Sequence, residues 1–148
     1  MLRKILVACD GSLQSEKALI AAIEDCMAED SELHIVHIMN IKKFSAIDSE
    51  SSYDGVESPH DISRKFLEKN RDETVNMIDR VCRGRDMIYT LHVKGGDPRH
   101  EIIDLAAETS ADLIVMGSTG KGLGSRILLG SVSAYVSVHS PVSALIVK

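Results

Sequence analysis

A glycine-rich stretch near the C-terminus is the part of this sequence best suited to chemistry. It runs Gly117-Ser-Thr-Gly-Lys-Gly-Leu-Gly-Ser-Arg-Ile-Leu-Leu-Gly130-Ser131 and follows an apolar run. Glycines let backbone N–H groups approach a phosphate closely, and a helix that begins at Ser131 would present further N–H groups to the same anion. Lys121 adds a positive charge. Two interpretations fit this pattern, a phosphate-binding loop and a flexible surface loop.

The stretch differs from the common phosphate-binding and nucleophile motifs. Four residues separate Gly117 from Gly122, but the Lys-Ser/Thr pair that completes a Walker A loop does not follow. Gly120-x-Gly122-x-Gly124 has the wrong third gap for the dinucleotide-binding GxGxxG, and a GxSxG nucleophile elbow is missing. These motifs therefore assign no function.

Short apolar runs alternate with helical patterns along the chain. We expect strands over 5–9, 33–38, 87–93, 113–116 and 142–147, and helices over 12–29, 61–83, from 97 onward and over 131–139. Parallel strands need crossover connections, so this alternation predicts an α/β fold, a single domain with a parallel sheet covered on both faces. Residues 41–60 lack periodicity and form a long polar loop, either mobile or functional.

Two helix starts carry clear signals. Ser12 is a plausible N-cap, and Asp97-Pro98 supplies an acceptor at the N-cap and a ring at the first helical position. The stripe expected to point inward from helix 61–83 consists of Ile62, Phe66, Leu67, Val75, Ile78 and Val81.

A ligand site in such a sheet lies beyond the carboxyl ends of the strands, where the strand order reverses. The informative ends are Cys9-Asp10-Gly11 after the first strand and Met116-Gly117 after the fourth. A sheet ordered 3-2-1-4-5 would bring these two ends side by side. At this point the order is an assumption.

Composition limits the function classes. The chain has 148 residues, a formal net charge of −5, 3% aromatic residues and no Trp. This acidic balance does not favour nucleic acid or anionic membranes as partners. The three cysteines Cys9, Cys26 and Cys82 lack metal-ligand spacing and are expected to be buried reduced thiols. With no signal peptide pattern and no long apolar segment, we expect a cytoplasmic protein.

Several segments together resemble the ATP-binding, UspA-like universal stress proteins. Gly117-x2-Gly120-x9-Gly130-Ser131 is similar to the nucleotide-binding signature of that family. Further similar segments are Lys4-Ile-Leu-Val-Ala-Cys-Asp10-Gly-Ser12, Gly96-Asp97-Pro98 with Ile102-Ile103, Ala111-Asp-Leu-Ile-Val-Met-Gly117, Leu129-Gly-Ser-Val-Ser133 and Ser140-Pro-Val142. The resemblance covers the chain except residues 41–60.

The resemblance implies a fold and a ligand. It implies a Rossmann-like open sheet of five parallel strands, ordered 3-2-1-4-5 with helices on both faces, as in the adenine nucleotide alpha hydrolase-like proteins. ATP or AMP would then lie between the first and fourth strand ends, with any Mg²⁺ held mainly by phosphates. The residues implied at this site are Cys9, Asp10, Ile38, Met39, Met116, Gly117, Gly120, Lys121, Gly130, Ser131 and Val132.

The sequence also departs from the family pattern. Thr119 and Lys121 stand where many members have His and Arg, and Ser140 replaces a frequent Cys. Lys121 keeps the positive charge but lacks the forked guanidinium of arginine, so the geometry of its hydrogen bonds to a phosphate differs. The resemblance further implies a homodimer through the last strand, Val142–Val147, whose apolar edge would otherwise be exposed.

Three functions remain open. The first is a nucleotide-binding regulatory module in a stress response. The second is an enzyme that hydrolyses ATP slowly; Lys121 and Arg126 could supply charge, but no general base stands near them in the sequence. The third is a nucleotide-free dimeric interaction protein. His34 and His37 lie three apart on a strand, so they point to opposite faces and cannot share a metal.

Overall fold

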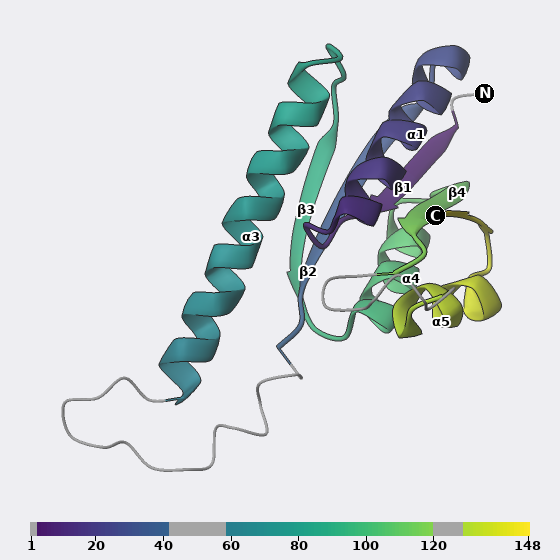
Figure 1. The fold of residues 1–148 in the computed structure, drawn as a ribbon. Helices are drawn as coiled ribbons and strands as arrows, with labels where there is room; N and C mark the ends of the chain where they lie inside the picture. The colour runs from purple at the N-terminus through teal and green to yellow at the C-terminus, as the bar shows by residue number, and fades with distance from the viewer. Residues whose placement is uncertain (1–2, 42–58, 120–128) are drawn as a thin grey trace.

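The computed structural model describes residues 3–41, 59–119 and 129–148 of the chain. These residues form five strands and four helices in alternation (Figure 1). The strands are β1 (Lys4–Ala8), β2 (Glu32–Met39), β3 (Thr90–Gly95), β4 (Leu113–Gly117) and β5 (Ser143–Val147). The helices are α1 (Leu13–Glu29), α3 (Pro59–Arg83), α4 (Pro98–Glu108) and α5 (Ser131–His139).

All five strands are parallel and follow the order β3-β2-β1-β4-β5. In the register, Val7 pairs with Ile35 of β2 on one side and with Val115 of β4 on the other. The strand order reverses at β1, so the carboxyl ends of β1 and β4 lie side by side at the switch point where α/β sheets bind ligands. The α/β fold class and the expected order 3-2-1-4-5 are both confirmed.

Two apolar cores lie on opposite faces of the sheet, and the alternation of side chains along each strand separates them. One core combines odd-numbered positions such as Ile5 and Ile35 with the buried faces of α1 and α3. The other combines even-numbered positions such as Leu6 and Ile114 with α4, and with Val136 of α5. Figure 1 shows α1 and α3 on one side of the strands and α4 and α5 on the other.

The expected helix caps are present. The Ser12 side chain accepts a hydrogen bond from the backbone N–H of Ser15 at 3.1 Å, and Asp97 Oδ1 accepts one from the N–H of Arg99 at 3.1 Å. Each cap satisfies a donor that a first helical turn leaves without an intrahelical partner. Both caps stand at the end of the sheet where the strands finish, so they also fix where α1 and α4 begin beside the site.

Two sequence expectations need correction. The third strand begins at Thr90 rather than Met87, because the N–H of Met87 donates to Cys82 O at 3.0 Å and closes the end of α3. In α3, the expected inward residues Ile62 and Phe66 are 55% and 58% exposed. Figure 1 shows the reason, since the N-terminal end of α3 extends past the carboxyl ends of the strands.

The remaining expectations concern the polar loop, the cysteines and membrane-spanning helices. The polar loop of residues 41–60 lies almost wholly outside the described residues, and α3 begins at Pro59. Cys9, Cys26 and Cys82 are buried and free, as expected. No helix within the described ranges is long and apolar enough to cross a membrane.

Candidate functional site

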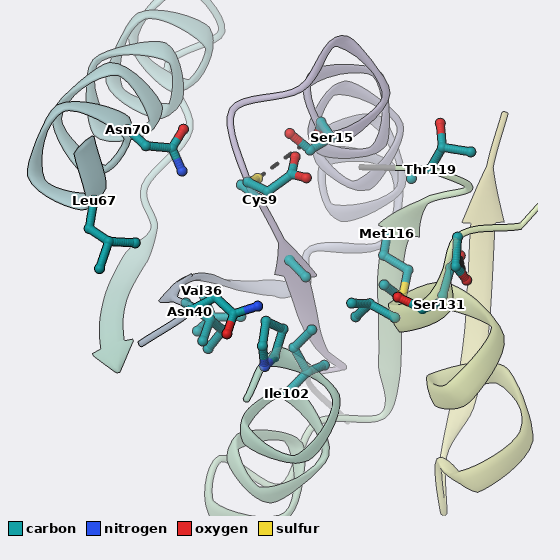
Figure 2. Close-up of a pocket in the computed structure, with 18 of the residues that line it drawn as sticks. Cys9, Ser15, Val36, Asn40, Leu67, Asn70, Ile102, Met116, Thr119 and Ser131 are labelled. Atoms are coloured by element: carbon teal, nitrogen blue, oxygen red, sulfur yellow. Dashed lines mark hydrogen bonds between the residues drawn. The ribbon is translucent and has the colours of Figure 1, made fainter. Parts of the chain in front are cut away.

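A cavity of about 530 Å³ lies at the carboxyl end of the sheet, bordered by the ends of β1, β2 and β4 (Figure 2). Helices α3, α4 and α5 and the start of α1 complete its walls. Its lining residues are Ala8, Cys9, Asp10, Ser15, Val36, Ile38, Asn40, Phe66, Leu67, Asn70, Pro98, Ile102, Met116, Gly117, Thr119, Gly130, Ser131, Val132 and Ser133. A volume of this order is typical of small-molecule and cofactor sites.

The end of β1 is held by hydrogen bonds to β2. The N–H of Cys9 donates to Val36 O at 2.9 Å, and the carbonyl of Cys9 accepts from Nδ1 of His37 at 2.9 Å. Because a carbonyl only accepts, the Nδ1 atom of buried His37 carries a proton. The next residue, Asp10, accepts the N–H of Ser12 through Oδ1 at 2.9 Å. Its carboxylate is thereby positioned at the cavity wall.

The end of β4 passes very close to the first turn of α1. A Cβ atom on Gly117 would lie 2.8 Å from the backbone carbon of Gln14. Real Cβ atoms do not approach backbone this closely, so a residue with a side chain would force β4 and α1 apart. Glycine at position 117 thus lets β4 and the capped start of α1 meet at the rim of the cavity.

The start of α5 is tied to the end of β4 across the glycine-rich stretch. Ser118 O accepts the N–H of Gly130 at 2.6 Å and the hydroxyl of Ser133 at 2.7 Å. The N–H of Ser118 donates in turn to Val147 O of β5 at 2.8 Å. We call Ser118, Gly130 and Ser133 the α5 clamp. It directs the N-terminus of α5, with Gly130 as N-cap, toward the cavity.

Most of the residues predicted for the site do line this cavity. Those that line it are Cys9, Asp10, Ile38, Met116, Gly117, Gly130, Ser131 and Val132. Met39 is not part of the lining, because adjacent strand residues point to opposite faces and Ile38 takes the cavity side. Gly120 and Lys121 lie outside the described residues.

Sequence reasoning missed the wall formed by α3 and α4. Phe66, Leu67 and Asn70 of α3 line the cavity, as do Pro98 and Ile102 of α4. The sequence predicts Pro98 as a helix start and Ile102 as an apolar position on that helix, and it predicts no role for either in the site. The sequence does contain a signal for α3. Asn70 lies at helical spacing between Leu67 and Thr74, so it places a polar amide on a helical face whose other residues are apolar or small.

Reactive thiols do not contribute to the chemistry of this cavity. Burial raises the pKa of Cys9 far above its ordinary value, with the nearby Asp10 carboxylate adding to the effect. A thiol in this state is protonated and a poor nucleophile. Within the described ranges, no group of three His, Cys, Asp or Glu side chains could hold a metal ion. The cavity therefore offers binding groups: a carboxylate, backbone amides and apolar walls.

Comparison with known proteins agrees with this architecture. The model of the universal stress protein family matches residues 1–148. The universal stress protein YxiE of Bacillus subtilis is 33% identical over 156 aligned positions, which cover 100% of both chains. The solved structure of UspA from Lactobacillus plantarum aligns over 99% of this chain and 97% of its own with a TM-score of 0.77, at 21% identity.

Some structural neighbours are nucleotide complexes. One is the universal stress protein from Archaeoglobus fulgidus in complex with dAMP, with a TM-score of 0.65 and 20% identity over 100% of this chain and 98% of that one. At this identity the likeness concerns the fold alone. The match of the family model over the whole length, together with YxiE, establishes the relationship: this chain belongs to the universal stress protein family.

Proposed function

We propose that this chain binds an adenine nucleotide, ATP or AMP, in the cavity at the carboxyl end of the sheet. The observation that carries the proposal is the convergence of Asp10 and the N-terminus of α5 on one cavity of about 530 Å³ at the switch point of the sheet. A carboxylate suits the hydroxyl groups of a ribose, and a helix N-terminus suits a phosphate. The dAMP complex of the Archaeoglobus relative adds support from the same family.

The phosphates would lie at the start of α5. Gly130 is the N-cap of α5 and has no side chain that could occupy the space in front of the first helical N–H groups. Ser131 and Val132 follow and line the cavity. The N–H groups of a first helical turn lack intrahelical acceptors and carry the positive end of the helix dipole. Lys121 and Gly120 of the glycine-rich stretch are proposed as further phosphate contacts.

The adenosine would lie toward the sheet. Asp10 and Cys9 are proposed beside the ribose and base, and Met116 and Gly117 beside the ribose. Ile38 lines the cavity. The main chain at the end of β2, around Ile38 and Met39, is proposed to lie beside the adenine. Any Mg²⁺ that accompanies ATP would be held mainly by phosphate oxygens and water, because Asp10 is the one carboxylate among the described cavity residues.

A regulatory module fits this cavity better than a fast ATPase. Rapid hydrolysis requires a positioned water molecule and stabilisation of charge at the γ-phosphate. The described cavity residues include no His, Glu or Lys, and Asp10 already accepts the N–H of Ser12. We therefore expect slow turnover at most, with the bound nucleotide acting as a signal to partners in a stress response.

The proposal is tested by calorimetric titration of ATP with Mg²⁺ into nucleotide-free protein and into two matched variants. Ser131→Glu places a carboxylate where the phosphates would lie, whereas Ser137→Glu adds the same charge at another exposed position of α5. A carboxylate in a first helical turn stabilises the helix, so Ser131→Glu should fold. We expect Ser131→Glu to weaken binding at least a hundredfold and Ser137→Glu to leave it unchanged. No saturable binding by the unmodified protein, in calorimetry and in equilibrium dialysis, would refute the proposal.

We further propose a homodimer formed edge to edge through β5. Among the described residues, β4 is the one strand that pairs with β5, and Leu145 on β5 is 45% exposed. Val147 O accepts from the N–H of Ser118, which directly follows β4, so by alternation the N–H groups of Ala144 and Ile146 point to the outer edge. Unpaired strand edges favour association with another strand.

A proline can separate dimer formation from folding. Ala144→Pro removes an outward N–H without touching the bonds to β4, and prolines are tolerated on edge strands in this orientation. We expect the variant to sediment as a monomer, while the unmodified protein sediments as a dimer in analytical ultracentrifugation. A dimer that persists in Ala144→Pro would exclude β5 pairing as the interface.

A further inference from the structure

The face of α3 that packs against the sheet continues toward the N-terminus of the helix, where it lines the cavity. Thr74, Ile78 and Cys82 form its buried C-terminal part, and the last two pack in the core beneath β1 and β2. Leu67 and Asn70 lie on the same stripe at helical spacing, toward the N-terminus, and both line the cavity. The sheet ends between the two parts, so the same helical face meets strands at one end and an open cavity at the other.

Asparagine is an unusual residue at this place in the stripe. It is a poor helix former in helix interiors, because its amide competes for backbone hydrogen bonds. Here the backbone of α3 is held by Thr74, whose hydroxyl donates to the carbonyl of Asn70 at 2.7 Å. A side-chain amide has two donors and two acceptor positions, so it can keep a contact within the protein and still present a donor–acceptor pair to a ligand.

Asn70 lies across the cavity from the proposed phosphate position. Figure 2 shows Asn70 projecting from α3 toward the side of Cys9, with Ser131 at the start of α5 on the far side of the site. A nucleotide whose phosphates contact α5 and whose ribose lies at the ends of β1 and β4 would bring its base toward the end of β2 and the neighbouring α3. There it would meet apolar surface from Phe66, Leu67 and Ile38, which suits the faces of a purine.

We propose that Asn70 contacts the edge of the base and makes the site selective for adenine over guanine. This inference rests on the proposed nucleotide-binding function. Adenine presents an amino donor at N6 beside an acceptor at N7, and the amide of Asn matches both. Guanine presents two acceptors, O6 and N7, on the same edge, which leaves the amide oxygen of Asn70 facing an acceptor.

The test is a competition titration of ATP against GTP with three variants of α3. Asn70→Asp keeps the shape but removes the donor, and Asn70→Ala removes both groups and favours the helix. Asn76→Asp is the matched control, because Asn76 is exposed on the same helix. Circular dichroism establishes that each variant is folded before binding is measured.

We expect the unmodified protein and Asn76→Asp to prefer ATP over GTP to the same degree. Asn70→Ala should lower the ratio of ATP to GTP affinity about tenfold, in line with the loss of one bidentate base contact. Asn70→Asp should instead weaken the binding of both nucleotides, because a carboxylate oxygen then faces the N7 acceptor that both purines present. If ATP binds and the ratio stays constant in Asn70→Ala, the inference is wrong while the nucleotide site stands. If the unmodified protein binds neither nucleotide, the proposed function fails, and the inference fails with it.

Discussion

The two walls of the cavity are built in different ways. On the side of β1, β4 and α5, backbone groups are bonded to one another: Gly130 and Ser133 donate to Ser118 O, and His37 donates to Cys9 O. On the side of α3, the lining residues Phe66 and Leu67 belong to the helical turns that extend past the sheet. Hydrogen bonds between backbone groups fix the geometry of the first wall, which we call the bonded wall. The side chains that project from α3 can be substituted without disturbing the fold.

This contrast suggests a division of roles. Phosphate is common to all nucleotides, and its recognition through backbone N–H groups depends on fixed geometry rather than on residue type. The base distinguishes one nucleotide from another, and its recognition depends on side chains. A site with phosphate contacts on the bonded wall and base contacts on the α3 wall can change ligand preference by substitution in α3 alone.

The largest expected effect comes from adding one carbon to the bonded wall. In Gly117→Ala, the new Cβ would lie 2.8 Å from the backbone of Gln14, so β4 and α1 must separate. We expect the free energy of unfolding to fall by about 2–3 kcal/mol, as for overpacked cores. Urea denaturation monitored by circular dichroism measures the change.

The matched substitution on the other wall is Leu67→Ala, which removes three carbons from a half-buried position at the cavity. It should cost less than about 1 kcal/mol, because little packed surface is lost. Equal losses in Leu67→Ala and Gly117→Ala would contradict the contrast between the two walls.

A smaller effect is expected in the α5 clamp. Ser133 is buried, and its hydroxyl lies 2.7 Å from Ser118 O and 3.1 Å from Gly130 O. Ser133→Ala should lower the free energy of unfolding by about 1–2 kcal/mol, the usual cost of a lost buried hydrogen bond. It should also weaken nucleotide binding, because the start of α5 is no longer held to β4.

Ser137→Ala is the control for the clamp. Its hydroxyl donates to Ala134 O at 2.8 Å on the exposed face of the same helix. We expect its free energy of unfolding and its nucleotide affinity to stay near those of the unmodified protein. A loss of affinity in Ser137→Ala as large as that in Ser133→Ala would mean that the clamp does not position α5.

The two walls also differ in how well the sequence predicts them. The glycine stretch and the strand ends follow from local patterns, since Asp10 and Gly117 each terminate an apolar run. The strand order follows from the family resemblance, because periodicity cannot supply it. The α3 wall depends on where a long helix leaves the sheet. The apolar pattern assigned Ile62 and Phe66 to the core because it carries no record of where the strands end.

The N-cap of α4, Asp97, gives a smaller, pH-dependent effect. The hydrogen bonds from the side chain and backbone of Arg99 lower the pKa of Asp97 to about 2. Because the folded-state pKa lies below the ordinary value of 3.8, the stabilisation is present above that value and is lost as the pH falls toward 2. Asp97→Ala should lower the free energy of unfolding at pH 7 by about 1 kcal/mol and remove this acid dependence.

Asp97→Asn is the control for charge at the cap. Asparagine caps helices about as well as aspartate, so the helix start should survive at neutral pH while the dependence between pH 4 and pH 2 disappears. Thermal unfolding of the three proteins across this range measures both effects. If the stability of Asp97→Asn still falls between pH 4 and pH 2 as in the unmodified protein, another carboxylate is responsible for the acid dependence.

The smallest expected effect lies at the β2–β3 edge, on the α4 face of the sheet. His34 Nε2 lies 2.6 Å from Glu32 Oε1, and His34 Nδ1 lies 3.0 Å from His92 Nε2. A carboxylate accepts, so His34 carries its proton on Nε2, and His34 Nδ1 accepts from His92 when both rings are neutral. If both rings were protonated, two N–H groups would face each other across the contact between His34 Nδ1 and His92 Nε2.

The pKa of His92 should therefore be low. Burial lowers it first, followed by the charges of His34 and Lys94, with Glu108 opposing them. The folded state favours neutral His92, so its contribution to stability is present above the ordinary value of 6.5 and is lost as the pH falls below it. Histidine NMR titration should give His92 a midpoint below the ordinary value of 6.5. The His92 midpoint should rise in His34→Gln, since that change removes the neighbouring ring. An unchanged midpoint would mean that burial and the charge of Lys94 lower the pKa of His92 without a contribution from His34.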